Sequence, residues 1–241
     1  MKKVLLSLSI LALIVPVQNV QSQDLQDIMG QLGAGSTKAV YEPAYKFDTY
    51  MQMEVSDQEN QKVVYNAYLT RDGSSYAVIF EDQGAKSVIV FDTKNSTMLM
   101  LVENEGEKTG FAMGIDPEAF ADMEEDSDFE GENEYESFKT GNKKTLLGYE
   151  CDEYLIKDES SEVRVWSSEK LGKEVEKKMF RNQQIFGGLF THAAGMEGMA
   201  LEYEFKDLDS GEQGIMRVTQ IDLKSNKTIA TSDYTVMSMG Q

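Results

Sequence analysis

Cysteine and histidine each occur once, as Cys151 and His192, in a chain of 241 residues. One cysteine can neither close a disulfide within the chain nor supply the paired thiolates of a structural zinc site. The sequence also lacks a phosphate-binding glycine loop, a G-x-S-x-G elbow and an H-E-x-x-H motif. These absences give catalysis no positive support, so we expect no enzymatic activity and no cofactor. Stability must come from the hydrophobic core itself.

Proline is scarce, with 3 residues, and no tract rich in proline, glycine and serine divides the chain into two apolar halves. We therefore expect a single mainly β domain over residues 23–241. After the first residues, no segment reaches the roughly 18 uninterrupted apolar residues that a membrane helix needs. The mature protein is expected to have no transmembrane segment.

The first residues have the pattern of a secretory signal peptide. Lys2 and Lys3 precede an apolar run, Val4–Val15, that is too short to span a bilayer. Small side chains at Val20 and Ser22 suit a cleavage site, so residues 1–22 are expected to be removed. The sequence predicts export to the periplasm or the extracellular space.

Basic residues are few, 23 lysines and arginines against 42 acids, and the formal net charge is −19. Removal of the signal peptide with its two lysines makes the balance more acidic still. Such a surface repels nucleic acid and anionic lipid headgroups, so nucleic-acid binding is excluded.

Alternation of apolar and polar residues with a period of two is the dominant pattern and predicts antiparallel strands. In Tyr45–Val55, for example, every second residue falls on one expected buried face. Short connections such as RDGS and ENEGE have the glycine, aspartate and asparagine residues typical of hairpins. The predicted strands are Tyr45–Val55, Lys62–Thr70, Ser75–Glu81, Lys86–Asp92, Thr97–Glu103, Lys108–Gly114, Thr145–Ile156, Ser161–Ser168, Met199–Leu208, Gly214–Lys224 and Ser232–Met239.

Helical patterns occur in a few places. Apolar residues recur at helical spacing over Leu25–Leu32, Asp116 can cap a short helix that begins at Pro117, and Lys173–His192 is amphipathic. Together these patterns predict a mainly β (α+β) fold, with one curved antiparallel sheet or half-barrel of about ten strands and two or three covering helices.

Cys151 lies in the stretch TLLGYECDEYLI, Thr145–Ile156, in which alternation places it on the same face as Leu147 and Leu155. A nucleophilic cysteine needs a base and a lowered pKa, and His192 is the one histidine available. Free cysteine is among the most buried residue types, so we interpret Cys151 as part of the core.

The segment 122–136 is strongly acidic and begins like a calcium-binding EF loop. Asp126, Asp128, Glu130 and Glu132 are weak candidate ligands, because Ser137 stands where a bidentate glutamate closes such a loop. A solvated acidic loop is the simpler interpretation, and no metal site is assigned.

Methionine is abundant, with 14 residues, and many of these fall on the faces of predicted strands. Because methionine is flexible and polarizable, a cavity lined by it can adapt to an acyl chain. Ordinary core filling explains the pattern equally well at this point. The methionines concerned are Met51, Met53, Met98, Met100, Met113, Met199 and Met216.

The stretch Lys139–Gly172, KTGNKKTLLGYECDEYLIKDESSEVRVWSSEKLG, resembles a family catalogued as domain of unknown function 4412, whose members are secreted bacterial proteins. The match is carried by Gly148, Tyr149, Cys151, Tyr154 and Trp166. The resemblance implies a LolA-like shape, in which a curved half-barrel closed by helices shelters acyl chains. It supplies no established activity and no functional residues.

Two functions from different classes follow as expectations. The first is a non-enzymatic envelope protein that binds an apolar ligand, such as a lipid or a lipoprotein acyl chain, in a β half-barrel. The second is an interaction or structural protein with a filled core and an acidic surface that binds calcium weakly.

Overall fold

The computed structural model describes residues 37–59, 61–82, 84–115, 136–157, 160–175, 196 and 198–239. Within these residues the chain forms strands, one short α-helix and one turn of 3₁₀ helix. The strands are β1 (Ala44–Phe47), β2 (Thr49–Asp57), β3 (Lys62–Leu69), β4 (Ser75–Asp82), β5 (Ala85–Asp92), β6 (Thr97–Asn104), β7 (Glu107–Gly114), β8 (Glu136–Leu146), β9 (Tyr149–Lys157), β10 (Ser161–Ser168), β11 (Met199–Asp207), β12 (Gln213–Asp222), β13 (Lys227–Ala230) and β14 (Thr235–Met239).

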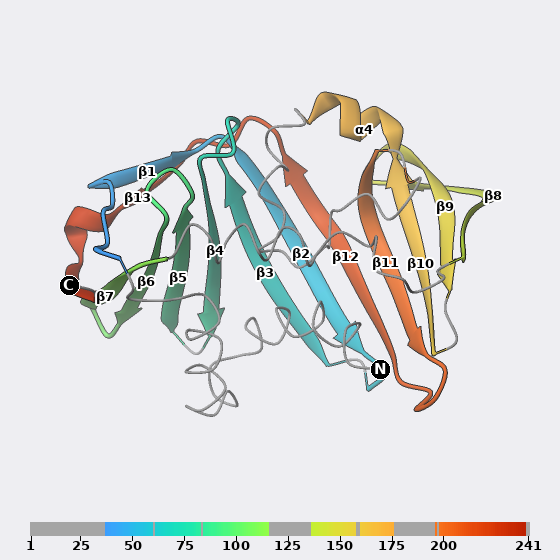
Figure 1. Ribbon diagram of the computed structural model, residues 1–241, viewed down its shortest axis with the longest axis horizontal. Helices are drawn as coiled ribbons and strands as arrows, with labels where there is room; N and C mark the ends of the chain where they lie inside the picture. Colours follow the sequence, from blue (N-terminus) through green and yellow to red (C-terminus); the bar gives the residue numbers. More distant parts are fainter. Residues whose placement is uncertain are drawn as a thin grey trace.

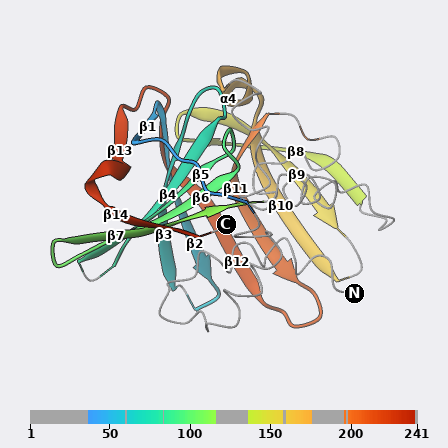
Figure 2. The ribbon, with the colours of Figure 1, turned by 60° about the vertical axis from the view of Figure 1, so that its left-hand side comes forward.

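Most of the strands belong to one open, 12-stranded sheet with the order β14-β7-β6-β5-β4-β3-β2-β12-β11-β10-β9-β8 (Figure 1). Each pair is antiparallel except β14 and β7, which run parallel. Figure 2 shows the twist of this sheet, in which β6 and β7 cross the direction of β11 and β12. Right-handed strand twist accumulates across so many strands, and the sheet is strongly curved rather than flat.

The predicted meander is confirmed, since β2 to β7 are neighbours in the sheet in their sequence order. Residues with positive φ build the hairpin turns. Glu105 (φ 51°) and Gly106 (φ 87°) join β6 to β7, while Leu147 (φ 52°) and Gly148 (φ 82°) join β8 to β9. Two successive positive φ angles are the geometry of a type I′ turn, which matches the twist of the flanking strands.

The single strand predicted over Thr145–Ile156 is therefore wrong. Its residues belong to β8 and β9, and Leu147 stands in the turn between them with 41% of its surface exposed rather than on a buried face. Leu-Gly is not one of the dipeptides usually associated with this turn, so the alternation of the sequence does not reveal it.

A strand predicted over Tyr45–Val55 is divided at Asp48. Ala44–Phe47 forms β1, which pairs with β13 in a separate two-stranded sheet, and Thr49–Asp57 forms β2 of the large sheet. The alternation of buried residues continues through the break, so Phe47 and Met51 are both almost fully buried. They enter different core clusters, which a period of two along the chain does not reveal.

The predicted fold class is wrong on the number of strands, on their direction and on the helices. The large sheet is mixed and has 12 strands, because β14 pairs in parallel with β7. Among the residues that the structure describes, the α-helix is α4 (Glu169–Glu174), which has 6 residues. The predicted helix Lys173–His192 overlaps its end, where Val175 is already extended. The remainder of that prediction, and the helices predicted over Leu25–Leu32 and after Asp116, lie outside the described residues.

Two main hydrophobic clusters stabilise the sheet. The first contains Met51, Met53 and their neighbours from β2 to β7, together with Leu171 and Val175 at α4. The second packs the other face of β4 to β7 against Tyr45 and Phe47 of β1 and Ile229 of β13. Figure 1 shows β1 and β13 lying across the ends of these strands. The large sheet thus buries apolar side chains on both of its faces in this half.

Helix α4 is positioned by close backbone contact. Ser168 caps its first turn, since the hydroxyl accepts a hydrogen bond from the Leu171 amide at 3.4 Å. A Cβ atom at Gly172 would lie 2.6 Å from Gly198 Cα, and one at Gly198 (φ 93°) would lie 2.3 Å from the Ser168 carbonyl oxygen. Glycine at both positions allows the helix to meet the start of β11.

We predict that Gly198→Ala lowers the free energy of unfolding by about 3 kcal/mol, because it adds a backbone clash to the strain of a positive φ. The control is Gly211→Ala, where φ is 77° and an added Cβ meets nothing within 4 Å. Strain alone should cost about 1 kcal/mol there. Urea titration of both variants measures the difference, and equal losses would contradict the packing described here.

Candidate functional site

One face of the large sheet carries apolar side chains across nearly its whole width, and we call it the apolar face. It is the face on which Met51, Met53 and Val55 of β2 lie, since residues two apart in a strand point to the same side. Cross-strand pairing extends it in both directions. The central row pairs Ile221, Met51, Ala67, Val78, Ile89, Met100, Phe111 and Met237, in that order from β12 to β14.

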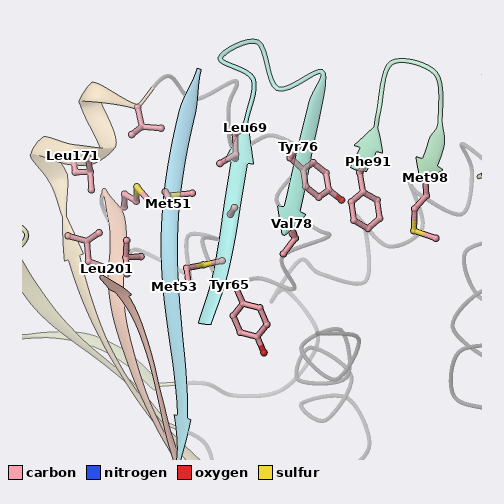
Figure 3. Close-up of a cluster of buried hydrophobic side chains, with 14 of the residues drawn as sticks. Met51, Met53, Tyr65, Leu69, Tyr76, Val78, Phe91, Met98, Leu171 and Leu201 are labelled. Atoms are coloured by element: carbon pink, nitrogen blue, oxygen red, sulfur yellow. The ribbon is translucent and has the colours of Figure 1, made fainter. Parts of the chain in front are cut away.

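Flanking rows on the same face are also rich in apolar and aromatic side chains (Figure 3). In one of them the rings of Tyr76 and Phe91 stack with their centroids 4.6 Å apart, and in the other the rings of Tyr65 and Phe80 meet edge to face at 5.5 Å. One row pairs Thr49, Leu69, Tyr76, Phe91, Met98 and Met113, and the other pairs Val218, Met53 and Tyr65.

Burial changes along the central row. Met51 and Ala67 are fully buried, Met100 is half-buried, and Phe111 and Met237 at the β14 edge are 40% and 53% exposed. Large apolar side chains that are neighbours in a row and open to solvent form a continuous surface patch. The apolar face therefore begins inside the core and ends at the surface of the protein.

The methionines singled out from the sequence are buried or half-buried. Each of them lies on the apolar face or in the first hydrophobic cluster, which contains part of that face. The row that passes through Met216 continues to Val55 on one side and to Tyr203, Val165 and Tyr154 on the other.

The opposite face carries a polar row over β9 to β2. Its members, paired in order, are Glu153, Trp166, Glu202, Arg217 and Glu54. Two of these carboxylates are deeply buried, Glu153 at 3% and Glu202 at 1% exposure. A buried carboxylate needs charged or hydrogen-bonding partners, so their surroundings decide what chemistry they can perform.

Glu202 is held by two cations. Arg217 and Lys144 both donate to its carboxylate, and the Lys144 ammonium also lies 4.0 Å from the centre of the Trp166 ring. Burial alone raises the pKa of Glu202, but the hydrogen bonds from Arg217 and Lys144 outweigh it, and the pKa is lowered. Glu202 is thus an ionised partner in an ion-pair network.

Glu153 has a similar environment. Thr140 and Asn142 donate to one of its carboxylate oxygens at 2.6 Å each, and Arg164 lies 3.4 Å from the other. Burial raises its pKa, and these hydrogen bonds together with the Arg164 charge lower it below the usual value. Neither glutamate has the raised pKa that suits a general acid at neutral pH.

A polar cleft of about 440 Å³ lies beside β1 and the turns that precede β4 and β6. Some of its polar groups bond within the protein. Asp92 accepts hydrogen bonds from the Tyr45 hydroxyl at 2.8 Å and the Asn95 amide at 2.7 Å, and Lys94 lies 3.6 Å from Glu42. These contacts order the turns beside the cleft.

The prediction that Cys151 is buried is confirmed. It is a free cysteine with no exposed surface, on β9, in the core cluster that includes Leu171. Burial raises the pKa of its thiol above the usual value, which disfavours the reactive thiolate.

The other residues considered from the sequence, His192 and the candidate calcium ligands Asp126, Asp128, Glu130 and Glu132, lie outside the described residues. Within the part of the chain that is described, no group of three or more histidine, cysteine, aspartate or glutamate side chains is placed to hold a metal ion. None of the helices there is long and apolar enough to cross a membrane.

Residues 47–230 match the family described as domain of unknown function (DUF4412). The chain belongs to the DUF4412 family. This confirms the resemblance noted in Lys139–Gly172 and extends it over most of the chain. No curated protein has a significant sequence match to this DUF4412 protein.

The solved structures that match the DUF4412 chain share little sequence with it. A structure of PNGF-II is 13% identical with a TM-score of 0.39 over 80% of this chain, which spans only 32% of the length of that protein. An uncharacterized conserved protein from Thermus thermophilus is 9% identical with a TM-score of 0.39, over 90% of this chain and 99% of the other. A LolA superfamily protein from Nitrosomonas europaea is 9% identical with a TM-score of 0.27, and the match covers 83% of this chain and 93% of that protein.

We predict that Cys151→Ala lowers the free energy of unfolding by about 1–2 kcal/mol, because few atoms leave the core. The buried thiol should react with a thiol reagent much more slowly in the native protein than in urea. Equal rates in the two states would show that Cys151 is accessible.

Glu202→Gln should destabilise the protein by about 3 kcal/mol at pH 7, at the lower end of the cost of breaking a buried ion pair, because Lys144 and Arg217 remain partly exposed. The folded-state pKa is lowered, so the stabilisation is complete above the unfolded value near 4.5 and is lost as the pH falls through the folded value. Urea titrations between pH 7 and pH 3 should therefore show the two proteins converging in acid.

Glu150→Gln is the matched control for this measurement, because Glu150 pairs with Lys143 at 2.6 Å but is 70% exposed. An exposed pair contributes about 0–1 kcal/mol. Losses of equal size in the two variants would contradict a special role for the buried carboxylate.

Proposed function

We propose that this protein is a non-enzymatic binding protein of the bacterial envelope, which holds an apolar ligand such as a lipid or a lipoprotein acyl chain against the apolar face. The observation that carries the proposal is the unbroken central row of apolar residues from Ile221 to Met237. Its exposed end at Phe111 and Met237 gives a flexible chain a place to make contact.

The composition of the face supports a ligand of irregular shape. Met100 occupies the central row next to the exposed Phe111, and Met98 and Met113 pair with each other in the row beside it. Unbranched thioether side chains can change rotamer at little cost and fit acyl chains of different length and curvature. Rigid β-branched residues alone would favour one fixed shape.

The polar groups support binding rather than catalysis. The two most deeply buried carboxylates of the polar row are Glu153 and Glu202. Cations and hydrogen-bond donors of the protein itself already balance their negative charges. Cys151 is buried with a raised pKa. Catalysis would require at least one such group to be accessible to a substrate and to have a pKa near neutral pH.

The proposed location rests on the N-terminal pattern. Lys2 and Lys3 followed by the apolar run Val4–Val15 favour export, and the acidic balance of the chain favours solubility in an aqueous compartment. A soluble envelope protein with an apolar binding face is suited to carry a lipid or the acyl chains of a lipoprotein between membranes.

A second candidate is a structural or interaction protein whose core is filled and whose acidic surface meets a partner. The complete burial of Met51 and Ala67 favours it, because side chains that are already packed offer no space to a ligand. The two candidates differ in whether the apolar face accepts an acyl chain.

Native mass spectrometry of protein purified from its own envelope should show a bound lipid. The same protein, once delipidated, should bind a fluorescent fatty acid. A bare mass together with failure to bind the fluorescent fatty acid would refute the proposal and favour the structural candidate.

Phe111→Ser should weaken binding of the fluorescent fatty acid about 5-fold or more, because it removes apolar contact at the open end of the central row. The control is Val64→Ser, which removes a side chain of similar exposure, 44% against 40%, from the opposite face of β3. Equal effects of the two substitutions on affinity would place the ligand elsewhere.

A further inference from the structure

Tyr203 is placed at the centre of a row on the apolar face. It pairs with Val165 of β10 on one side and with Met216 of β12 on the other. Met216 pairs in turn with Val55, which lies two residues from Met53 on the same face of β2. The phenol therefore projects among apolar side chains, in a cluster that also holds Tyr154 and Met196.

The hydroxyl group of Tyr203 is buried and has no hydrogen-bond partner among the described residues. Burial raises its pKa well above the usual value for tyrosine, so it is a neutral donor. Three other tyrosine hydroxyls donate hydrogen bonds within the protein: Tyr45 to Asp92 at 2.8 Å, Tyr50 to Asn66 at 2.9 Å and Tyr149 to Glu174 at 2.9 Å.

An unsatisfied buried hydroxyl costs about 1–3 kcal/mol, and such groups are rare in folded proteins. Phenylalanine would fill the same space without this cost. A ligand that brings an acceptor oxygen to this position removes the penalty, so the hydroxyl indicates the chemistry of the ligand and not only its apolar character.

The surroundings favour an uncharged acceptor. The row neighbours of Tyr203 are apolar, and the nearest cation along the row is Lys139, which pairs with Tyr154 and lies 2.8 Å from Asp152. An ionised carboxylate would lose its hydration at Tyr203 without gaining a cation. An ester or amide carbonyl accepts one hydrogen bond and carries no charge.

We propose that the Tyr203 hydroxyl donates a hydrogen bond to the ester or amide carbonyl of an acyl ligand bound on the apolar face. This inference rests on the proposed function and deepens it, because it selects acylated esters and amides over free fatty acids and hydrocarbons. The carbonyl lies at β11 and the chain runs along the neighbouring rows of β12 and β2, a part of the apolar face distinct from its open end at Phe111.

The test compares three probes of equal chain length, methyl laurate, laurate and dodecane, each measured by displacement of a bound fluorescent acyl probe at pH 8. Tyr203→Phe should weaken methyl laurate about 3- to 10-fold, the effect of one neutral hydrogen bond, and should change dodecane less than 2-fold. The wild-type protein should prefer methyl laurate to laurate.

Tyr65→Phe is the matched control. Tyr65 lies on the same face, in the row of Met53, and is 3% exposed, but its hydroxyl is not among the buried groups without a partner. This substitution should leave the ratio of affinities for methyl laurate and dodecane unchanged.

Stability provides a second measurement. Because the hydroxyl makes no hydrogen bond within the described part of the protein, Tyr203→Phe should leave the ligand-free melting temperature unchanged or raise it. A clear decrease would overturn the proposal, since it would reveal an internal partner.

The outcomes separate this inference from the function on which it rests. If wild-type protein binds none of the probes, the proposed function fails. If it binds methyl laurate and Tyr203→Phe binds it equally well, the function stands and the role of Tyr203 is refuted.

Discussion

The pairing of β2 with β12 is the constraint on which the rest of the sheet depends. It joins the meander β2–β7 to the strands β8–β12, and its register shifts at one position, between Val218 and Gln220. Thr219 is the additional residue, and its hydroxyl donates to the Gln52 side chain at 3.0 Å. Because of this bulge, Met216, Val218 and Ile221 all face the same side. Without it, part of β12 would turn its apolar residues to the opposite face.

The two faces of the sheet have different stabilising interactions as a result. Around β2 the apolar face packs methionine, valine and aromatic side chains, whereas the opposite face over β9 to β12 carries buried carboxylates and their cations. The register of β10 against β11 also shifts by one residue, between Trp166 and Ser167, and Leu201 is the additional residue. Leu201 can therefore join the first hydrophobic cluster while Glu202 stays in the polar row. Small irregularities thus keep the apolar face continuous while the opposite face is ionic over β9 to β12.

Alternation in the sequence predicted the strands β3 to β7 and the burial of Met51, Met53 and Cys151, because a period of two is a local property. It could not predict the turn at Leu147–Gly148, the break at Asp48 or the short β13. It also could not reveal the parallel pairing of β14, since strand direction depends on distant partners. For the same reason the ion pairs of Glu202 and the isolated hydroxyl of Tyr203 became visible only when residues far apart in sequence were placed side by side.

The hydroxyl of Thr219 contacts both the side chain and the backbone carbonyl of Gln52, and these two residues are 167 positions apart in the chain. Within each half, by contrast, most neighbouring strands follow one another directly in the sequence, and their hairpins close short loops. Closing a longer loop costs more entropy, and folding slows as contacts become less local. We therefore expect the two halves to acquire structure before they meet, with the β2–β12 junction formed late. During that interval the edges of β2 and β12 are unpaired strands, open to association with other chains.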